Sequence, residues 1–371
     1  FVSTSYPLGS GTGSPVGGLS PNPTIQSNSD ITWESTYQTN LGLDLSLWKN
    51  RANLNIDVYQ SKTDKLLLYQ PTMAFTGVTQ GITNIGSMKN KGIEIELSTT
   101  NIVNKNFKWT TQANFSHTEN KVVELGAEKY IRTLGERSEV YQAKPGDPLI
   151  QYYGYKTDGV WLSQAQIDEA KAAGITSSLA NLFLPGGLKL VDVNGDKKID
   201  TDDRTIIGNP YPDFIWGMTN GFTYKAFDLS FSLQGSQGGE LINGDANYNE
   251  TKRYNTNYNE NRWVSAMFPG DGKTPYDTTG FNWMLTDYVV EDASFVALRD
   301  VTIGFTMPSE YVKKFFLNGM RLYFSGSNLF YYSPKGYRGV NSEGRSTSGA
   351  FYGSALIDGY QRGPFPLARI V

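Results

Sequence analysis

The chain has 371 residues, no cysteine, one histidine and a formal net charge of −3. The lack of cysteine excludes a disulfide scaffold and a thiol site, and the slight acidity argues against nucleic acid as a partner. No run of about 18 apolar residues occurs, so no transmembrane helix is expected. The chain opens on Phe1-Val2-Ser3 without a secretory signal, so we expect an export signal upstream.

Apolar and polar residues alternate along many stretches of the chain. The first stretch sets four leucines against small or polar residues: Leu41, Leu43, Leu45 and Leu47 against Gly42, Asp44 and Ser46. Successive side chains of a strand point to opposite faces, so each stretch predicts a strand with one apolar and one polar face. In chain order, strands are predicted at residues 34–47, 51–67, 86–99, 106–120, 213–224, 227–242, 293–307 and 319–331.

The predicted connections alternate between short and long. Residues 48–50, 100–105 and 225–226 form short connections and 308–318 a moderate one, whereas 68–85, 121–212, 243–292 and the chain after 331 are long. Short turns at one end and long loops at the other are typical of outer-membrane β-barrels, with periplasmic turns and extracellular loops. We therefore expect the apolar side chains to face lipid and the polar ones to face the lumen.

Aromatic residues make up 13% of the chain, and many lie near predicted strand ends. Membrane barrels place aromatic girdles at both interfaces, which would explain these positions, whereas a soluble β core is the alternative. The examples are Trp33, Trp48, Tyr59, Tyr69, Trp109, Trp216, Tyr224, Phe330 and Tyr331.

Five segments, met in order along the chain, resemble SusC/RagA-type TonB-dependent outer-membrane transporters. They are residues 30–44 (DITWESTYQTNLGLD), 84–95 (NIGSMKNKGIEI), 190–212 (LVDVNGDKKIDTDDRTIIGNPYP), 291–300 (EDASFVALRD) and 325–330 (SGSNLF). The resemblance implies an all-β fold, the C-terminal eight or so antiparallel strands of a large barrel of roughly 22 strands, a size associated with plugged transporters. Residues 1–371 would form part of one barrel domain that lacks the plug, the early strands and the final strand.

The same resemblance implies a location and a function. The chain would lie in the outer membrane of a Bacteroidota-type cell, joined to the rest of the same barrel. It would serve active import of oligosaccharides or peptides, with a SusD-like surface lipoprotein as lid and TonB acting through the absent plug. The alternative is a soluble or surface-exposed glycan-binding β-protein without transport activity.

An acidic segment in loop 121–212 has the spacing of a calcium loop. Oxygen-bearing side chains fall at loop positions 1, 3, 5, 9 and 12, and position 7 would offer a backbone carbonyl. Lys197 stands where glycine usually makes the sharp turn, and no helices clearly flank the segment, so it is closer to a dockerin loop than to an EF-hand. The alternative is a metal-free acidic turn. The predicted ligands of a structural Ca²⁺ are Asp192, Asn194, Asp196, Lys198, Asp200 and Asp203.

Aromatic residues in the two long loops are the candidate substrate-binding residues. Exposed rings can stack on sugars or grip a peptide backbone, although packing within the loop itself is the alternative. A helix is predicted from Ser163 to Ala173, with Ser163 as N-cap. The candidates are Tyr152, Tyr153, Tyr155 and Trp161 in loop 121–212, and Trp263 and Trp283 in loop 243–292.

Catalysis finds little support in the sequence. A catalytic triad would have to use His117, and no nucleophile-elbow motif is present. Glu94 and Glu96 share the polar face of one strand, where lumenal water would solvate them. We therefore expect no enzymatic activity.

Overall fold

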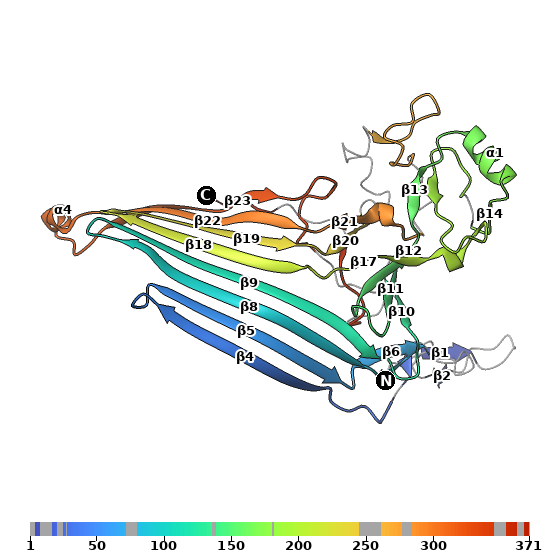
Figure 1. The fold of residues 1–371 in the computed structure, drawn as a ribbon, viewed down its shortest axis with the longest axis horizontal. Helices are drawn as coiled ribbons and strands as arrows, with labels where there is room; N and C mark the ends of the chain where they lie inside the picture. The colour runs from blue at the N-terminus through green and yellow to red at the C-terminus, as the bar shows by residue number, and fades with distance from the viewer. Residues whose placement is uncertain are drawn as a thin grey trace.

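The structure is a computed structural model that describes residues 4–7, 17–20, 25–26, 28–71, 80–135, 139–179, 182–244, 261–276, 284–344, 354–361 and 367–370. Eight long strands dominate it: β4 (Ser35–Leu47), β5 (Ala52–Asp64), β8 (Ser87–Val103), β9 (Phe107–Glu124), β18 (Phe214–Tyr224), β19 (Phe227–Gln237), β22 (Phe295–Thr306) and β23 (Arg321–Tyr332). They form one antiparallel sheet in the order β23-β22-β19-β18-β9-β8-β5-β4 (Figure 1). The predicted all-β fold and its eight strands are confirmed.

Two predicted strands end earlier than expected. β5 stops at Asp64, because Lys65 adopts a left-handed φ of 60°. β19 stops at Gln237, because Gly238 and Gly239 have φ values of 76° and 74° and turn the chain out of the sheet. Residues 240–243, predicted as the end of the same strand, form the separate strand β20 instead.

The short connections gather at one end of the sheet, on the left in Figure 1. The β4–β5 turn places Trp48, Lys49 and Asn50 in the left-handed region. The longest of these connections, between β22 and β23, contains α4 (Ser309–Val312) and the 3-10 turn η5 (Lys313–Phe315). No helix among the described residues is long and apolar enough to cross a membrane.

The long connections gather at the other end and fold into small sheets (Figure 1). The short strands in these connections and in the chain before β4 are β1 (Thr4–Pro7), β2 (Gly17–Ser20), β3 (Ile25–Gln26), β6 (Leu67–Pro71), β7 (Gln80–Asn84), β10 (Ile131–Leu134), β11 (Val140–Ala143), β12 (Gln151–Gly154), β13 (Thr157–Val160), β14 (Thr176–Ser177), β15 (Leu188–Leu190), β16 (Lys198–Ile199), β17 (Thr205–Gly208), β20 (Glu240–Asn243), β21 (Val290–Asp292) and β24 (Tyr360–Gln361). Their helical segments are α1 (Gln164–Ala172), η2 (Thr201–Asp203) and η4 (Asp287–Val289). The segments 121–212 and 243–292 thus contain folded elements of their own.

The register of the large sheet aligns apolar residues with apolar residues and polar residues with polar residues on neighbouring strands. One cross-strand row is apolar on all eight strands: Leu45, Leu54, Leu97, Ala113, Met218, Leu233, Leu298 and Phe330. A neighbouring row, on the opposite face, is polar on all eight: Ser46, Asn53, Ser98, Gln112, Thr219, Ser232, Asp300 and Ser327. The predicted two-faced wall is therefore continuous across the sheet.

The apolar face is not covered by other parts of the described chain. Leu41 and Leu43 on the edge strand β4 are 75% and 50% exposed. Ile303, on the same face but near the opposite edge of the sheet, is 52% exposed. Near the turn end this face carries an aromatic row, in which the rings of Phe227 and Phe305 lie 4.9 Å apart. Phe107 and Tyr224 continue the row, as in the interfacial girdle of a membrane barrel.

The two edges of the sheet are β4 and β23. β4 has a long hydrogen-bonded neighbour on one side only among the described residues. Beside β23 lies the segment 367–370, which exchanges two backbone hydrogen bonds of 2.8 and 3.2 Å between Ser327 and Ile370. An open edge of this length invites pairing with a further strand.

Consecutive residues of β8 test the assignment of the two faces. Leu97 lies in the apolar row and Ser98 in the polar row. We expect Leu97→Arg to lower the free energy of unfolding by about 2–4 kcal/mol, because a cation facing lipid near the bilayer midplane is poorly solvated, and Ser98→Arg to lower it far less. Denaturant unfolding of the full-length protein from lipid vesicles measures both. Similar losses at the two positions would contradict the assignment.

Candidate functional site: the polar wall and the folded loops

The polar face of the sheet is hollowed into a groove of about 620 Å³. Uncharged groups dominate its polar lining, and carboxamides are the largest class. A carboxamide both donates and accepts hydrogen bonds, so this lining can contact sugar hydroxyls or peptide amides without a strong charge preference. The polar lining side chains are Asn53, Asn55, Glu96, Ser98, Gln112, Asn114, Thr219, Ser232, Gln234, Arg299 and Asp300.

Arg299 is the cation of this groove, and a β-bulge places it there. The register shifts between Ser232 and Leu233, so that Arg299 is an extra residue on β22. Its guanidinium donates to Gln234 Oε1 at 2.8 Å and to Asn328 Oδ1 at 3.3 Å, and it forms an ion pair with Glu343. The bulge thus links the wall to the segment after β23 and leaves Arg299 largely neutralised.

The folded loops share a buried core. It joins residues from segments far apart in the chain, including Val122, Tyr152, Ile242, Leu285 and Tyr360. The ring centroids of Tyr141 and Tyr152 lie 5.9 Å apart in an edge-to-face arrangement. This core holds both long segments together as one unit at the end of the wall.

Four of the predicted substrate-binding residues belong to that folded unit. Tyr152, Tyr155 and Trp161 are at most 1% exposed, and Tyr153 is 9% exposed. The Tyr152 hydroxyl donates to the Glu240 carbonyl at 2.8 Å, and Arg132 covers one face of the Tyr153 ring at 4.0 Å. Burial covers their ring faces, so the packing alternative describes these side chains and the structure offers no stacking platform at them.

The remaining two candidates lie in segment 243–292. Trp263 is half-buried, donates from Nε1 to the Leu162 carbonyl at 3.0 Å and stacks edge-on with Tyr276 at 6.2 Å. It lies against Gly186, where any side chain would collide with the indole. Trp283 lies outside the described residues. A role of these residues in substrate binding stays a prediction.

The predicted helix is confirmed as α1, which begins one residue after its predicted cap. Ser163 has an extended backbone, and its hydroxyl accepts from the Gln166 amide at 3.3 Å. Ile167 on this helix is fully buried, which fixes α1 against the loop.

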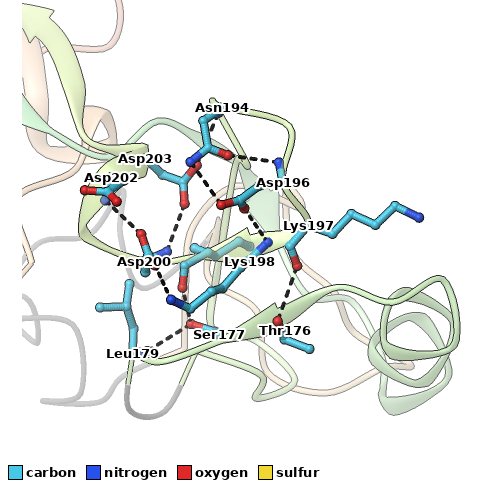
Figure 2. Close-up of polar contacts among 11 residues, drawn as sticks. Thr176, Ser177, Leu179, Asn194, Asp196, Lys197, Lys198, Asp200, Asp202 and Asp203 are labelled. Atoms are coloured by element: carbon cyan, nitrogen blue, oxygen red, sulfur yellow. Dashed lines mark hydrogen bonds and ion pairs between the residues drawn. The ribbon is translucent and has the colours of Figure 1, made fainter.

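The acidic segment forms a compact turn in which carboxylates accept from backbone amides (Figure 2). Asp196 accepts from the Lys198 amide at 2.7 Å, and Asp203, which is fully buried, accepts from the Val193 amide at 2.8 Å. Asp192, outside the labels of Figure 2, accepts from the amides of Gly195 and Lys197 at 2.7 and 2.8 Å.

The second half of the turn is a capping box. Asp200 accepts from the Asp202 amide at 2.8 Å, while Asp203 accepts from the Asp200 amide at 2.9 Å. The Lys198 ammonium pairs with the Asp200 carboxylate at 2.6 Å, and this contact holds the pKa of Asp200 below its usual value. Lys197 occupies the loop position at which calcium loops usually have glycine, and it has a left-handed φ of 66°.

A metal site is not assembled by these side chains in the structure. Among the described residues, no group of three or more His, Cys, Asp or Glu side chains is placed to hold a metal ion. The Lys198 side chain turns toward Asp200, and Asn194 Oδ1 accepts from the Asp196 amide at 2.9 Å. Amide capping accounts for these contacts, and calcium binding stays a prediction.

Sequence reasoning missed Arg299 and the extent of the carboxamide lining. The alternation alone assigns Asn53, Asn55 and Asn114 to the polar face. A count of the carboxamide side chains at polar-face positions would therefore have predicted this lining. Arg299 breaks the alternation, and only the pairing with β19 reveals the bulge.

Comparison with known proteins places the chain in a family. The family model described as "TonB dependent receptor-like, beta-barrel" matches residues 2–329. The TonB-dependent receptor P3 of Formosa agariphila is 33% identical over 349 residues, which cover 88% of this chain and 33% of that receptor. The TonB-dependent receptor SusC of Bacteroides thetaiotaomicron is 28% identical, over 86% of this chain and 30% of SusC. The chain thus spans about a third of these relatives.

Solved structures share the fold. The structure of the RagAB peptide transporter superposes with a TM-score of 0.69 and 18% sequence identity, over 99% of this chain and 37% of that chain. RagAB in its "open-open" state gives 0.66, over 92% of this chain and 35% of that chain. At this identity the likeness concerns the fold of the wall and its folded loops. Together with the family match, it identifies the chain as part of the β-barrel of a TonB-dependent receptor, a family of outer-membrane transport receptors and not of enzymes.

Proposed function

We propose that the full-length protein imports oligosaccharides or peptides across the outer membrane, and that the polar face of this sheet lines the path. One observation carries the proposal: a polar row crosses all eight strands directly beside an apolar row on the other face. Such a wall separates lipid from a wet lumen. Its carboxamides suit ligands rich in hydroxyls or amides.

A SusD-like lipoprotein is the partner we propose at the loop end. The shared core joins the folded loops into a platform, and the segment 261–276 packs through Trp263 and Tyr276 against a second buried cluster that contains Tyr155. This segment presents apolar side chains at its surface. Val264, Met267 and Phe268 are 60%, 84% and 68% exposed, which suits a protein interface. TonB would act through the plug that the resemblance to SusC/RagA-type transporters implies.

Uptake with matched tryptophan substitutions tests the transport path. Gln234 faces the groove and Leu233 faces the opposite side. We expect Gln234→Trp to slow uptake several-fold, because the indole narrows the path, whereas Leu233→Trp leaves uptake unchanged. The measurement is growth of a deletion strain, complemented with each variant, on single oligosaccharides or peptides, with the amount of folded protein checked by heat-modifiable gel mobility. Equal uptake by all variants on every nutrient that requires the protein would contradict the path.

Protease accessibility tests the orientation. Tyr130 in the segment 121–212 and Trp48 in the β4–β5 turn are both exposed, at 45% and 74%. Chymotrypsin added to intact cells should cleave after Tyr130 and spare Trp48, because we place the loops outside and the turns in the periplasm. Permeabilised cells, in which both ends are accessible, provide the control. Cleavage at Trp48 in intact cells would reverse the orientation.

A structural Ca²⁺ at the acidic turn is the second part of the proposal. The residues Asp192, Asn194, Asp196, Asp200 and Asp203 have calcium-loop spacing, and Asp196 and Asn194 are exposed at the turn. Binding would require the carboxylates to exchange some amide contacts for the ion. Repulsion among the carboxylates would then be relieved.

Calcium titration of the full-length protein checks this. We expect Ca²⁺, and not Mg²⁺ at the same concentration, to slow proteolysis within residues 182–212, and Asp196→Ala to abolish the difference while the barrel stays folded. Glu169→Ala, on the exposed face of nearby α1, is the control and should retain the calcium effect. Identical proteolysis with Ca²⁺ and with a chelator would leave the acidic turn as a metal-free cap.

A further inference from the structure

The apolar band on the outer face of the wall ends sharply at the loop end. On β9 the band covers about eleven residues, from Phe107 to His117, which matches the 9–11 residues of a tilted membrane strand. His117, in register with Ile93, is the last member, and its Nδ1 contacts the Asp213 carbonyl at 2.5 Å. Beyond this point the outward positions of β5, β8 and β9 become charged.

Four lysines occupy those outward positions. Lys91 lies two residues beyond Ile93 on β8 and faces Gln60 and Glu119 on the neighbouring strands. The next row contains three lysines side by side on three strands: Lys62, Lys89 and Lys121. All four therefore share one face, directly above the apolar band and on the side away from the groove.

The three-lysine row is unfavourable by itself. Side chains directly opposite each other in a sheet have Cβ atoms about 4.5–5.5 Å apart, and like charges at this distance repel. Two carboxylates relieve it in part: Asp64 pairs with Lys62 at 2.7 Å, and Glu119 pairs with both Lys91 and Lys121 at 2.7 and 2.6 Å.

The cluster keeps an excess of positive charge. Glu124 and Asp147 act on Lys62 and Lys121 only at longer range. Lys89, in the middle of the row, is exposed and forms no ion pair with any described residue. Four cations against two paired carboxylates leave room for a further anion.

We propose that this lysine cluster binds the phosphorylated headgroup of a lipid in the outer leaflet. The cluster continues the lipid-facing band at the level where headgroups begin, and lysine ammonium groups are strong phosphate donors at such a boundary. A headgroup phosphate above Lys89 would relieve the repulsion within the row. The flexible lysine stems can reach upward to it while their methylene groups stay against lipid.

Thermal unfolding of the full-length protein in nanodiscs tests the proposal. Nanodiscs of phosphatidylcholine contain either bisphosphorylated lipid A or the same lipid with its phosphates removed. We expect the phosphorylated lipid to raise the Tm of the wild-type protein, and the double variant Lys89→Gln/Lys121→Gln to lose most of that rise. The double variant Lys89→Arg/Lys121→Arg should keep it, since the positive charge is retained.

Controls separate the lipid from other causes. Lys105→Gln removes the same charge from the exposed β8–β9 turn at the other end of the sheet, and should keep the full rise. Inorganic phosphate added to plain phosphatidylcholine nanodiscs should not reproduce the rise. Without lipid A, the glutamine double variant should be no less stable than the wild type, because like-charge repulsion is removed. An equal rise in the wild type and the glutamine variant, or an equal rise with the dephosphorylated lipid, would overturn the proposal.

Discussion

The antiparallel register of the eight-stranded sheet is the constraint on which the other features depend. Side chains alternate with a period of two, so a slip of one residue between two strands would move every lipid-facing side chain of one strand into the lumen. Leu54, for example, must lie opposite Leu45 and Leu97 to keep both faces continuous. The tight turns at one end fix this register. The turn at residues 48–50 is so short that β4 and β5 cannot shift relative to each other.

The folded loops depend on the same register at its other end. Each long segment leaves the sheet at the end of one strand and re-enters it at the start of the neighbouring strand. The long segments therefore meet at the same end of the sheet. Gly238 and Gly239 show how this is done: their left-handed backbone ends β19 and delivers β20 into a small sheet with β21 and β24. That sheet supplies Ile242 and Tyr360 to the core around Tyr152. The platform is therefore an extension of the wall and not an independent addition.

The sequence predicted the features that depend on neighbouring residues and missed those that depend on distant ones. The alternation of apolar and polar residues predicted all eight strands, and the N-cap Ser163 predicted α1. Both patterns lie within a few residues of the chain. The burial of Tyr152 has a different origin, since its neighbours Tyr141, Gly208 and Glu240 come together only in the fold. Arg299 was hidden for the same reason: its bulge exists only relative to β19. The acidic turn lies between these cases, because its spacing suits a cation and equally suits amide caps.

The charges of the wall are distributed by the same physical logic. In the groove, Arg299 is paired with Glu343 and contacts two carboxamides, so the groove presents mostly neutral hydrogen-bonding groups. A neutral lining would hold a hydrophilic ligand weakly, which suits the transport path that we propose. On that proposal, strong selection of a ligand would fall to surfaces other than this wall, at the loops or on a partner. On the outer face the balance is reversed: Lys89 forms no ion pair with a described residue where the apolar band ends, the position at which we propose lipid headgroups as its neighbours.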